Sequence, residues 1–340
     1  MKTYRTAIIG CGRRAYGHAN AYQLISNAKL VACSNKSDLR RRRKFANTYN
    51  TASYSSAKRM IEEEKPDLVH LVTMPDQSLN LLRMVSELGV PACLVEKPIA
   101  YGVRDWQQLC ELEAKSTTKF GVSKQFRWHP RLLECRKVLQ SGQLGRLKWL
   151  NISARMNLSA QGTHMIDFAR FLYNDRSFAW ALGNFAGLES FDAKQIGPDY
   201  NTGILVFEDG IPLYVEAGKG SSQSPYVGNG LNLYVDAVCT KGRIWFGLSH
   251  GLRIWYSDGR YQEIEGIWPA ISKPAQTRLV TSLLDTIENG TENRCQASKA
   301  YFTQEALCGL LESGLTHQKI NFPLDIPPGL MDRVRNQMNT

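Results

Sequence analysis

A glycine-rich turn near the start of the sequence has the spacing that dinucleotide phosphates require. Residues 10–15 carry small residues at the G-x-G-x-x-A positions, after an apolar run and before a helical pattern. The first glycine allows a sharp bend, the second lets the backbone approach a pyrophosphate, and the small third residue lets the helix pack on the strand. The helix N-terminus adds free N–H groups. We therefore predict a dinucleotide site at Gly10, Cys11, Gly12, Arg13, Arg14 and Ala15, with a plain strand-helix turn as the alternative.

The end of the second expected strand favours a phosphorylated cofactor. NAD enzymes place an acidic residue there that hydrogen-bonds the ribose 2′-hydroxyl. This chain instead has Ser34, Asn35 and Lys36, followed by a basic run at residues 40–44. Hydroxyl, amide and cationic groups suit a 2′-phosphate, which a carboxylate would repel. We predict NADP rather than NAD, although Asp38 is the ribose ligand in an alternative register and most of the basic run fits a solvated helix face.

A lysine at the end of a short apolar run is the first candidate for proton transfer. Residues 92–95 lead directly into Glu96-Lys97-Pro98. A lysine held at the carboxyl end of a buried strand is poorly hydrated, so its pKa falls and its ammonium group can bond a substrate oxygen. A surface Lys–Glu pair before a proline turn is the alternative, and spacing alone does not separate the two.

These residues need a parallel sheet whose strand ends lie side by side. Strand-like runs at residues 6–9, 29–34, 67–73 and 92–95 alternate with helix-like segments, including one expected at 15–25. This alternation predicts an α/β fold with a doubly wound parallel sheet and right-handed crossovers. Ligands bind such sheets at the carboxyl ends of the strands, where Thr73, Met74 and Pro75 fall.

The pattern changes after residue 124. Short aromatic and β-branched runs between Phe178 and Glu265 are separated by Asp209-Gly210, Lys241-Gly242 and Asp258-Gly259. These dipeptides are hairpin signals and predict an antiparallel sheet. We expect a dinucleotide-binding domain over residues 1–124 and an α+β domain over 125–340. The proline-containing tail from Asn321 is expected to form a surface strap.

Four motifs in this order resemble the Gfo/Idh/MocA family of glucose-fructose oxidoreductase and inositol dehydrogenase-like enzymes. They are the glycine turn, Glu96-Lys97-Pro98, Gln125-Phe126-Arg127-x-x-Pro130 and Gly162-Thr163-His164-x-x-Asp167. The resemblance covers essentially the whole chain. It implies a Rossmann domain followed by an α+β domain with a large, mostly antiparallel sheet. It also implies NAD(P)-dependent hydride transfer at a carbon bearing a hydroxyl or ketone in a sugar, cyclitol or nucleotide-sugar.

The resemblance implies roles for individual residues as well. Lys97 would bind the reacting oxygen and help move its proton, with Glu96 in support, and His164 would face it across the substrate. Oxidising a secondary alcohol by hydride loss needs such a proton acceptor. The expected catalytic residues are Lys97 and His164; the cofactor residues are residues 10–15, Ser34, Asn35, Lys36, Thr73, Met74, Pro75, Glu96, Lys97 and Gln125; the substrate residues are Arg127, Thr163 and Asp167.

The sequence departs from the family pattern near His164. Ala160 stands one helical turn earlier, where many members carry an acidic partner, and the loop after Arg155 is short. Ser78 also replaces a histidine that is common after the third-strand proline motif. These departures motivate an alternative function, a non-catalytic NAD(P)-binding regulator of the same fold. Reduction of a C=N or C=C bond is a further alternative.

Composition narrows the remaining possibilities. The formal charge of +11 comes without a nucleic-acid-binding signature, so it favours anionic small molecules over nucleic acid. Eight cysteines without a C-x-x-C pair indicate reduced residues of a cytoplasmic protein and no metal site. No run is long enough for a membrane span or signal peptide. We expect a homodimer or homotetramer formed through the C-terminal sheet.

Overall fold

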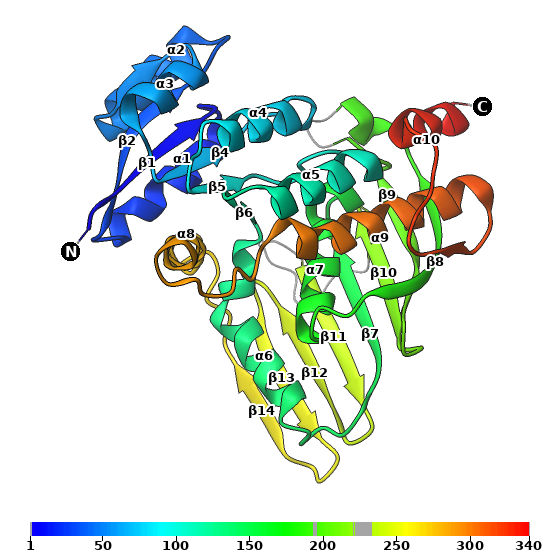
Figure 1. Ribbon diagram of the computed structural model, residues 1–340. Coiled ribbons are helices and arrows are strands. Elements are labelled where there is room, and N and C mark those ends of the chain that lie inside the picture. Colours follow the sequence, from blue (N-terminus) through cyan, green and yellow to red (C-terminus); the bar gives the residue numbers. More distant parts are fainter. Residues whose placement is uncertain (1, 193–195, 220, 222–232, 340) are drawn as a thin grey trace. The chain divides into compact units, whose positions relative to one another are not determined.

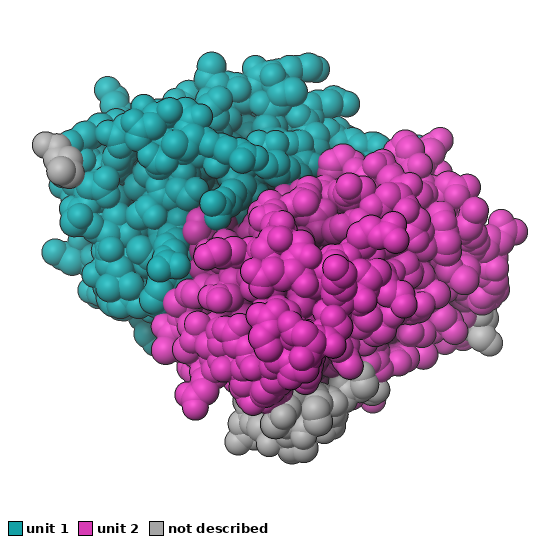
Figure 2. Space-filling view, turned by 90° about the horizontal axis from the view of Figure 1, so that it is seen from below, with its two compact units in different colours: residues 1–125, 272–301 teal, residues 126–271, 302–340 magenta. Residues whose placement is uncertain are grey.

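The computed structural model describes residues 2–192, 196–219, 221 and 233–339, which form two compact units (Figure 2). Unit 1 comprises Met1–Gln125 and Ser272–Tyr301; unit 2 comprises Phe126–Ile271 and Phe302–Thr340. The division expected from the sequence assigned residues 272–301 to the second domain. In the structure this segment belongs to unit 1, because its helix packs on the Rossmann sheet.

Unit 1 is built on a parallel sheet of six strands in the order β3-β2-β1-β4-β5-β6 (Figure 1). This is the doubly wound Rossmann order. The strands are β1 Tyr4–Ile9, β2 Ala28–Ser34, β3 Ala52–Tyr54, β4 Leu68–Leu71, β5 Ala92–Val95 and β6 Lys119–Val122. All residues of β4 and β5 are buried, as expected when helices cover both faces of a parallel sheet. The predicted fold class of this half is confirmed.

The helices of unit 1 are α1 Arg13–Asn20, α2 Leu39–Tyr49, α3 Ala57–Glu64, α4 Pro75–Glu87, α5 Val103–Lys115 and α8 Ser272–Asn289. The first helix is shorter than expected, because residues 21–24 tighten into a 3₁₀ turn, η1 (Ala21–Leu24). Here the Thr277 hydroxyl of α8 donates to the Ala21 carbonyl at 3.1 Å. The fourth helix begins at Pro75, because proline suits the first helical position.

Unit 2 is built on a nine-stranded sheet in the order β14-β13-β12-β11-β7-β10-β9-β8-β15. Its strands are β7 Leu147–Ala154, β8 Phe178–Ala186, β9 Tyr200–Phe207, β10 Pro212–Gly218, β11 Leu233–Cys239, β12 Gly242–Gly247, β13 Gly251–Tyr256, β14 Tyr261–Ile264 and β15 Ile320–Asn321. Only the pair β7 and β10 runs parallel among these described strands. The three predicted turn dipeptides join β9–β10, β11–β12 and β13–β14, so the mostly antiparallel sheet is confirmed.

Helices cover one face of this sheet. They are α6 Pro130–Gln140 and α7 Thr163–Leu172, which pack on β7, β11, β12 and β13. Short turns lie at Gln125–Trp128, Leu158–Gly162 and Glu189–Asp192, and α9 Ala297–Thr316 contributes to both units. Large apolar side chains stay exposed on the strands at Leu182, Tyr214, Trp255 and Tyr261. Association through this sheet stays a prediction.

The chain after Asn321 is more than the expected strap. β15 pairs with β8, and α10 (Leu330–Met338) buries Leu330, Met331 and Val334. The spacing of these three residues places them on one helical face, a signal that the prolines before them obscured. The strap prediction is therefore corrected to an edge strand, a connection and a docked helix.

The eight cysteines form no disulfide, and all except Cys110 are buried. None of the helices that the structure describes is long and apolar enough to cross a membrane. Within the same residues, no group of three His, Cys, Asp or Glu side chains is arranged to hold a metal ion.

Replacing Gly10 with alanine should destabilise unit 1, whereas the same change at Gly12 should not. Gly10 has φ +97°, and a Cβ there would lie 2.1 Å from the Val72 carbonyl oxygen, a backbone atom. A Cβ at Gly12 meets nothing within 4 Å. We expect Gly10→Ala to lower the free energy of unfolding by about 2 kcal/mol or more. Urea denaturation checks this, and equal stability of the two variants would contradict it.

Candidate functional site

The glycine turn has the geometry that a pyrophosphate needs. Gly10 closes the turn by donating its N–H to the Ser34 carbonyl at 2.8 Å. Gly12 is the N-cap of α1, has extended backbone and makes no side-chain cap bond. The first N–H groups of α1 therefore lie beside open space at Gly12, as an anion site at a helix N-terminus requires. The predicted turn is confirmed, and the residues present fit a dinucleotide.

Three buried hydroxyl oxygens line the carboxyl edge of the sheet without a partner. They belong to Ser34 at the end of β2, Thr73 after β4 and Ser123 after β6, and none has a hydrogen-bond partner among the described residues. Buried polar atoms are rarely left unsatisfied in a folded protein. Because all three lie at strand ends on the ligand-binding edge, they suit the polar groups of a nucleotide. Ser34 and Thr73 were predicted; Ser123 was missed.

Arg14 braces the site instead of standing free for phosphate. Its Nε lies 3.1 Å from Oε2 of Glu96, and its Nη2 lies 3.4 Å from Oε1 of Gln276. In the orientation of the Gln125 amide that satisfies its neighbours, the amide oxygen accepts from Arg14 at 3.2 Å and the nitrogen donates to the Ser123 carbonyl. Arg14 and Gln125 therefore connect α1 to the ends of β5 and β6.

Lys97 is buried, with 8% of its surface exposed, so the alternative of a surface ion pair does not hold. It follows β5 directly, and the Lys97–Pro98 peptide bond is cis. The pKa of Lys97 falls from 10.5 to about 7, mainly because of burial; Glu96 opposes this fall, and Lys124 and Arg14 add to it. An amine with this pKa exists in both protonation states near neutral pH, as proton transfer requires.

Glu96 remains a carboxylate although it is largely buried. Burial alone would raise the pKa of Glu96, but the charge of Arg14 and the hydrogen bond from His18 outweigh it and hold this pKa at about 2. The Glu96 carboxylate thus stays charged across the physiological pH range and places a constant negative charge beside Lys97. Its predicted supporting role agrees with these contacts.

Sequence reasoning missed a chain of polar side chains behind Glu96. The Nε2 of His18 lies 2.8 Å from Oε2 of Glu96, and its Nδ1 lies 2.9 Å from Nδ1 of His70. The Nε2 of His70 lies 2.5 Å from the Tyr22 hydroxyl. Both histidines are fully buried. The available signal was His70 itself, a polar residue inside the apolar run of β4.

In unit 2, the structure places the predicted His164 in the first turn of α7. A π-helical turn, Leu158–Gly162, leads into this helix and carries Ala160. His164 is 8% exposed and its ring meets the edge of Phe126, with centroids 5.0 Å apart. Thr163 begins the helix and is also buried. The catalytic role of His164 and the substrate role of Thr163 stay predictions.

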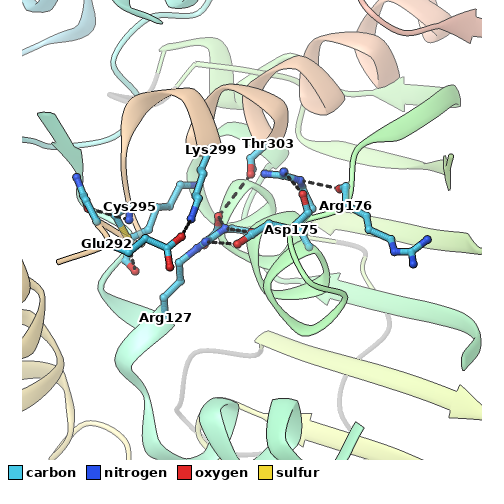
Figure 3. A network of polar contacts seen from close by, with 11 residues as sticks. Arg127, Asp175, Arg176, Glu292, Cys295, Lys299 and Thr303 are labelled. Carbon is cyan, nitrogen blue, oxygen red and sulfur yellow. Dashed lines mark hydrogen bonds and ion pairs between the residues drawn. The ribbon is translucent and has the colours of Figure 1, made fainter. Parts of the chain in front are cut away.

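Arg127 and Asp167, both predicted to contact substrate, take part in a buried ion network with Asp175 (Figure 3). Arg127 donates to both oxygens of Asp167, at 3.0 and 2.9 Å, and to both oxygens of Asp175, at 3.0 and 2.6 Å. Thr303 adds a contact to Asp167 at 3.4 Å. The side chains of Arg127 and Asp167 are each 2% exposed. These contacts anchor α7, and the substrate roles of Arg127 and Asp167 stay predictions.

Comparison with known families identifies the first unit. Residues 4–124 match the model described as an oxidoreductase family with an NAD-binding Rossmann fold, GFO_IDH_MocA. Residues 4–124 belong to the Gfo/Idh/MocA oxidoreductase family. The glycine turn and Glu96-Lys97-Pro98 both lie inside this stretch, so the resemblance drawn from the motifs is confirmed.

Individual relatives are similar to a larger part of the chain. D-apiose dehydrogenase of Paraburkholderia graminis is 25% identical over 242 residues, which cover 66% of this chain and 63% of that enzyme. The match thus spans less than two thirds of this curated relative. A solved Agrobacterium radiobacter oxidoreductase in complex with NAD+, L-tartaric acid and magnesium has a TM-score of 0.83 and 18% identity, covering 94% of this chain and 98% of its own. Levoglucosan dehydrogenase with NADH and levoglucosan has a TM-score of 0.83 and 15% identity, covering 95% and 100%. The two structures share the fold.

Removing the Arg127 side chain should destabilise unit 2 strongly. Arg127→Leu removes the cation that donates to both oxygens of Asp167 and of Asp175, and breaking a buried ion pair costs about 3–5 kcal/mol. Arg176→Leu is the matched control, because its ion pair with Asp209 is half exposed and worth about 1 kcal/mol at most. Urea unfolding of both variants measures the difference; similar losses would show that the network is not what anchors α7.

Proposed function

We propose that this protein is an NADP-dependent oxidoreductase that transfers a hydride between nicotinamide and a hydroxyl or ketone carbon of a sugar-like molecule. The observation that supports this best is Lys97, buried at the carboxyl end of β5, on the edge of the sheet where the glycine turn suits a dinucleotide. Family membership of residues 4–124 supplies the oxidoreductase class.

The chain's own part in the reaction is proton movement and positioning. A bound nicotinamide supplies or accepts the hydride. When a hydroxyl is oxidised, the neutral amine of Lys97 takes the hydroxyl proton; when a ketone is reduced, the ammonium form gives that proton back. Glu96 stabilises the ammonium form, and Arg14 keeps Glu96 ionised. His164 stays a prediction as a second catalytic residue.

The proposed substrate class rests on relatives of this chain. The curated match is named for D-apiose, and levoglucosan is bound in one structure of the same fold. Both are small, polyhydroxylated molecules. The high positive charge of this chain further suits an anionic sugar derivative. Within this class, the proposal takes an alcohol or ketone carbon as the reacting centre.

The NADP preference is supported by the polar groups at the end of β2. Asp38, the acid that would select NAD, caps α2 through Oδ1 at 2.8 Å from the Arg41 N–H and pairs through Oδ2 with Arg41 Nε at 3.0 Å. Both of its oxygens are therefore engaged. Lys36 is exposed beside the strand end, where its cation would face a 2′-phosphate.

Proton transfer through Lys97 should give a distinct pH profile. Because the neutral amine is the acceptor, kcat/KM for oxidation should rise with pH and level off above about 7, whereas kcat/KM for reduction should fall over the same range. Lys97→Met should lower turnover by about 10²- to 10⁴-fold while NADPH binding persists. Steady-state rates with a panel of sugars, polyols and keto-sugars, with NADPH binding followed by fluorescence, measure both effects.

The non-catalytic alternative makes the opposite prediction. A regulator that lost its chemistry, as Ala160 suggests, would bind NADPH but turn over no member of the panel. Its behaviour would not change in the Lys97→Met variant. Retained binding without turnover in the wild-type protein would therefore reject the enzyme and favour the regulator.

The NADP preference has its own test. Michaelis constants for NADPH and NADH, measured with one substrate, should favour NADPH. Lys36→Glu should weaken NADPH on the order of tenfold, because one charge-assisted contact is lost, and should leave NADH nearly unchanged. Lys44→Glu makes the same charge change at an exposed position farther along α2 and serves as the control. A clear preference of the wild-type protein for NADH would overturn the proposal.

A further inference from the structure

Behind Glu96 lies a chain of side chains that the proposed reaction does not explain. Tyr22 of η1, His70 of β4 and His18 of α1 follow one another at hydrogen-bond distance and end on the Glu96 carboxylate. Two fully buried imidazoles in direct contact are costly unless each nitrogen is paired with the right partner. The carboxylate of Glu96 at one end and the hydroxyl of Tyr22 at the other decide which nitrogen of each ring carries the proton.

Only one arrangement of protons satisfies every contact with both histidines neutral. Glu96 is an acceptor, so His18 donates from Nε2 and offers its Nδ1 lone pair to the next ring. His70 must then donate from Nδ1, which leaves its Nε2 to accept from the Tyr22 hydroxyl. All four groups are satisfied, and every N–H or O–H is directed toward Glu96.

The surroundings favour neutral rings. Burial lowers the pKa of both His18 and His70. Arg14 lowers the pKa of His18, while Glu96 raises it. The helix packed alongside, α8, presents the neutral Gln276 to Arg14, and its Lys273 is paired with Gln23. With His70 donating to Nδ1, His18 has no lone pair left to take up a proton.

We propose that Tyr22, through His70, locks His18 in the neutral form, so that Glu96 keeps its full negative charge for Lys97 and Arg14 and His18 adds no further cation that competes for it. Tyr22, His70 and His18 are thus positioning residues that act through Glu96. The effect on catalysis rests on the proposed function of Lys97, but the locked protonation pattern is a property of the free protein.

Removing the tyrosine hydroxyl should release the lock. In Tyr22→Phe, His70 loses the donor at Nε2 and can place its own proton there, which leaves its Nδ1 lone pair facing His18. His18 can then be protonated between this lone pair and the Glu96 carboxylate. A new positive charge beside Glu96 disfavours the ammonium form of Lys97, so the Lys97 titration midpoint should fall by roughly one pH unit.

Nuclear magnetic resonance of the free protein tests each step. In protein labelled with 15N-histidine, His70 should appear as the Nδ1–H tautomer and His18 as the Nε2–H tautomer, with both rings neutral throughout the range around neutral pH. In protein labelled with 13C at lysine Cε, the signal absent from Lys97→Met identifies Lys97, and its midpoint should lie at about pH 7.

Variants complete the test. Tyr22→Phe should make His18 titrate within that range and shift the Lys97 midpoint downward, and His70→Leu, which removes the donor altogether, should do the same. Tyr49→Phe removes a hydroxyl that lies 2.8 Å from the side chain of Asn20, which is on α1 like His18. This variant should change neither signal. Two Nε2–H tautomers in the wild-type protein, or an unchanged His18 in Tyr22→Phe, overturn the proposal. These NMR measurements need neither substrate nor nicotinamide. A protein without turnover would therefore overturn the proposed function and leave the proposed protonation pattern to be decided by NMR.

Discussion

Unit 1 depends on one buried carboxylate. Glu96 ends β5, accepts from His18 and pairs with Arg14, so it joins the first helix to the centre of the sheet. Without these partners a carboxylate in this position would take up a proton, because burial penalises its charge. With them it stays ionised, and the adjacent Lys97 keeps a counter-charge. The same contacts therefore position the first helix and keep a negative charge beside Lys97, whose pKa is about 7.

The features that could be predicted from the sequence are those with a local physical cause. Gly10 was identifiable because only glycine tolerates its φ of +97° beside the Val72 carbonyl. Lys97 was a candidate because it follows a short apolar strand closely, although spacing alone did not separate a buried lysine from a surface Lys–Glu pair. The hairpins of unit 2 were identifiable from dipeptides that favour positive φ, such as Gly210 at +87°. Each signal lies within a few residues of the structure that it predicts.

What could not be predicted depends on partners distant in sequence. Arg127 forms ion pairs with Asp167 and Asp175, 40 and 48 residues later, and no local pattern indicates these partners. The return of residues 272–301 to unit 1 likewise depends on a surface that forms only once the sheet exists. His70 shows the same limit, because β4 reads as an apolar strand and the side chains that satisfy its histidine come from α1 and η1.

The value of a neutral histidine beside Glu96 follows from the electrostatics of Lys97. Desolvation lowers the pKa of this lysine, and the attraction of Glu96 is what stops the fall at about 7. A protonated His18 would share that carboxylate and weaken its attraction for the ammonium form of Lys97. A chain that keeps His18 neutral removes this competition. Tyr22 is suited to the outer end, because burial raises the pKa of its hydroxyl and so keeps it a donor.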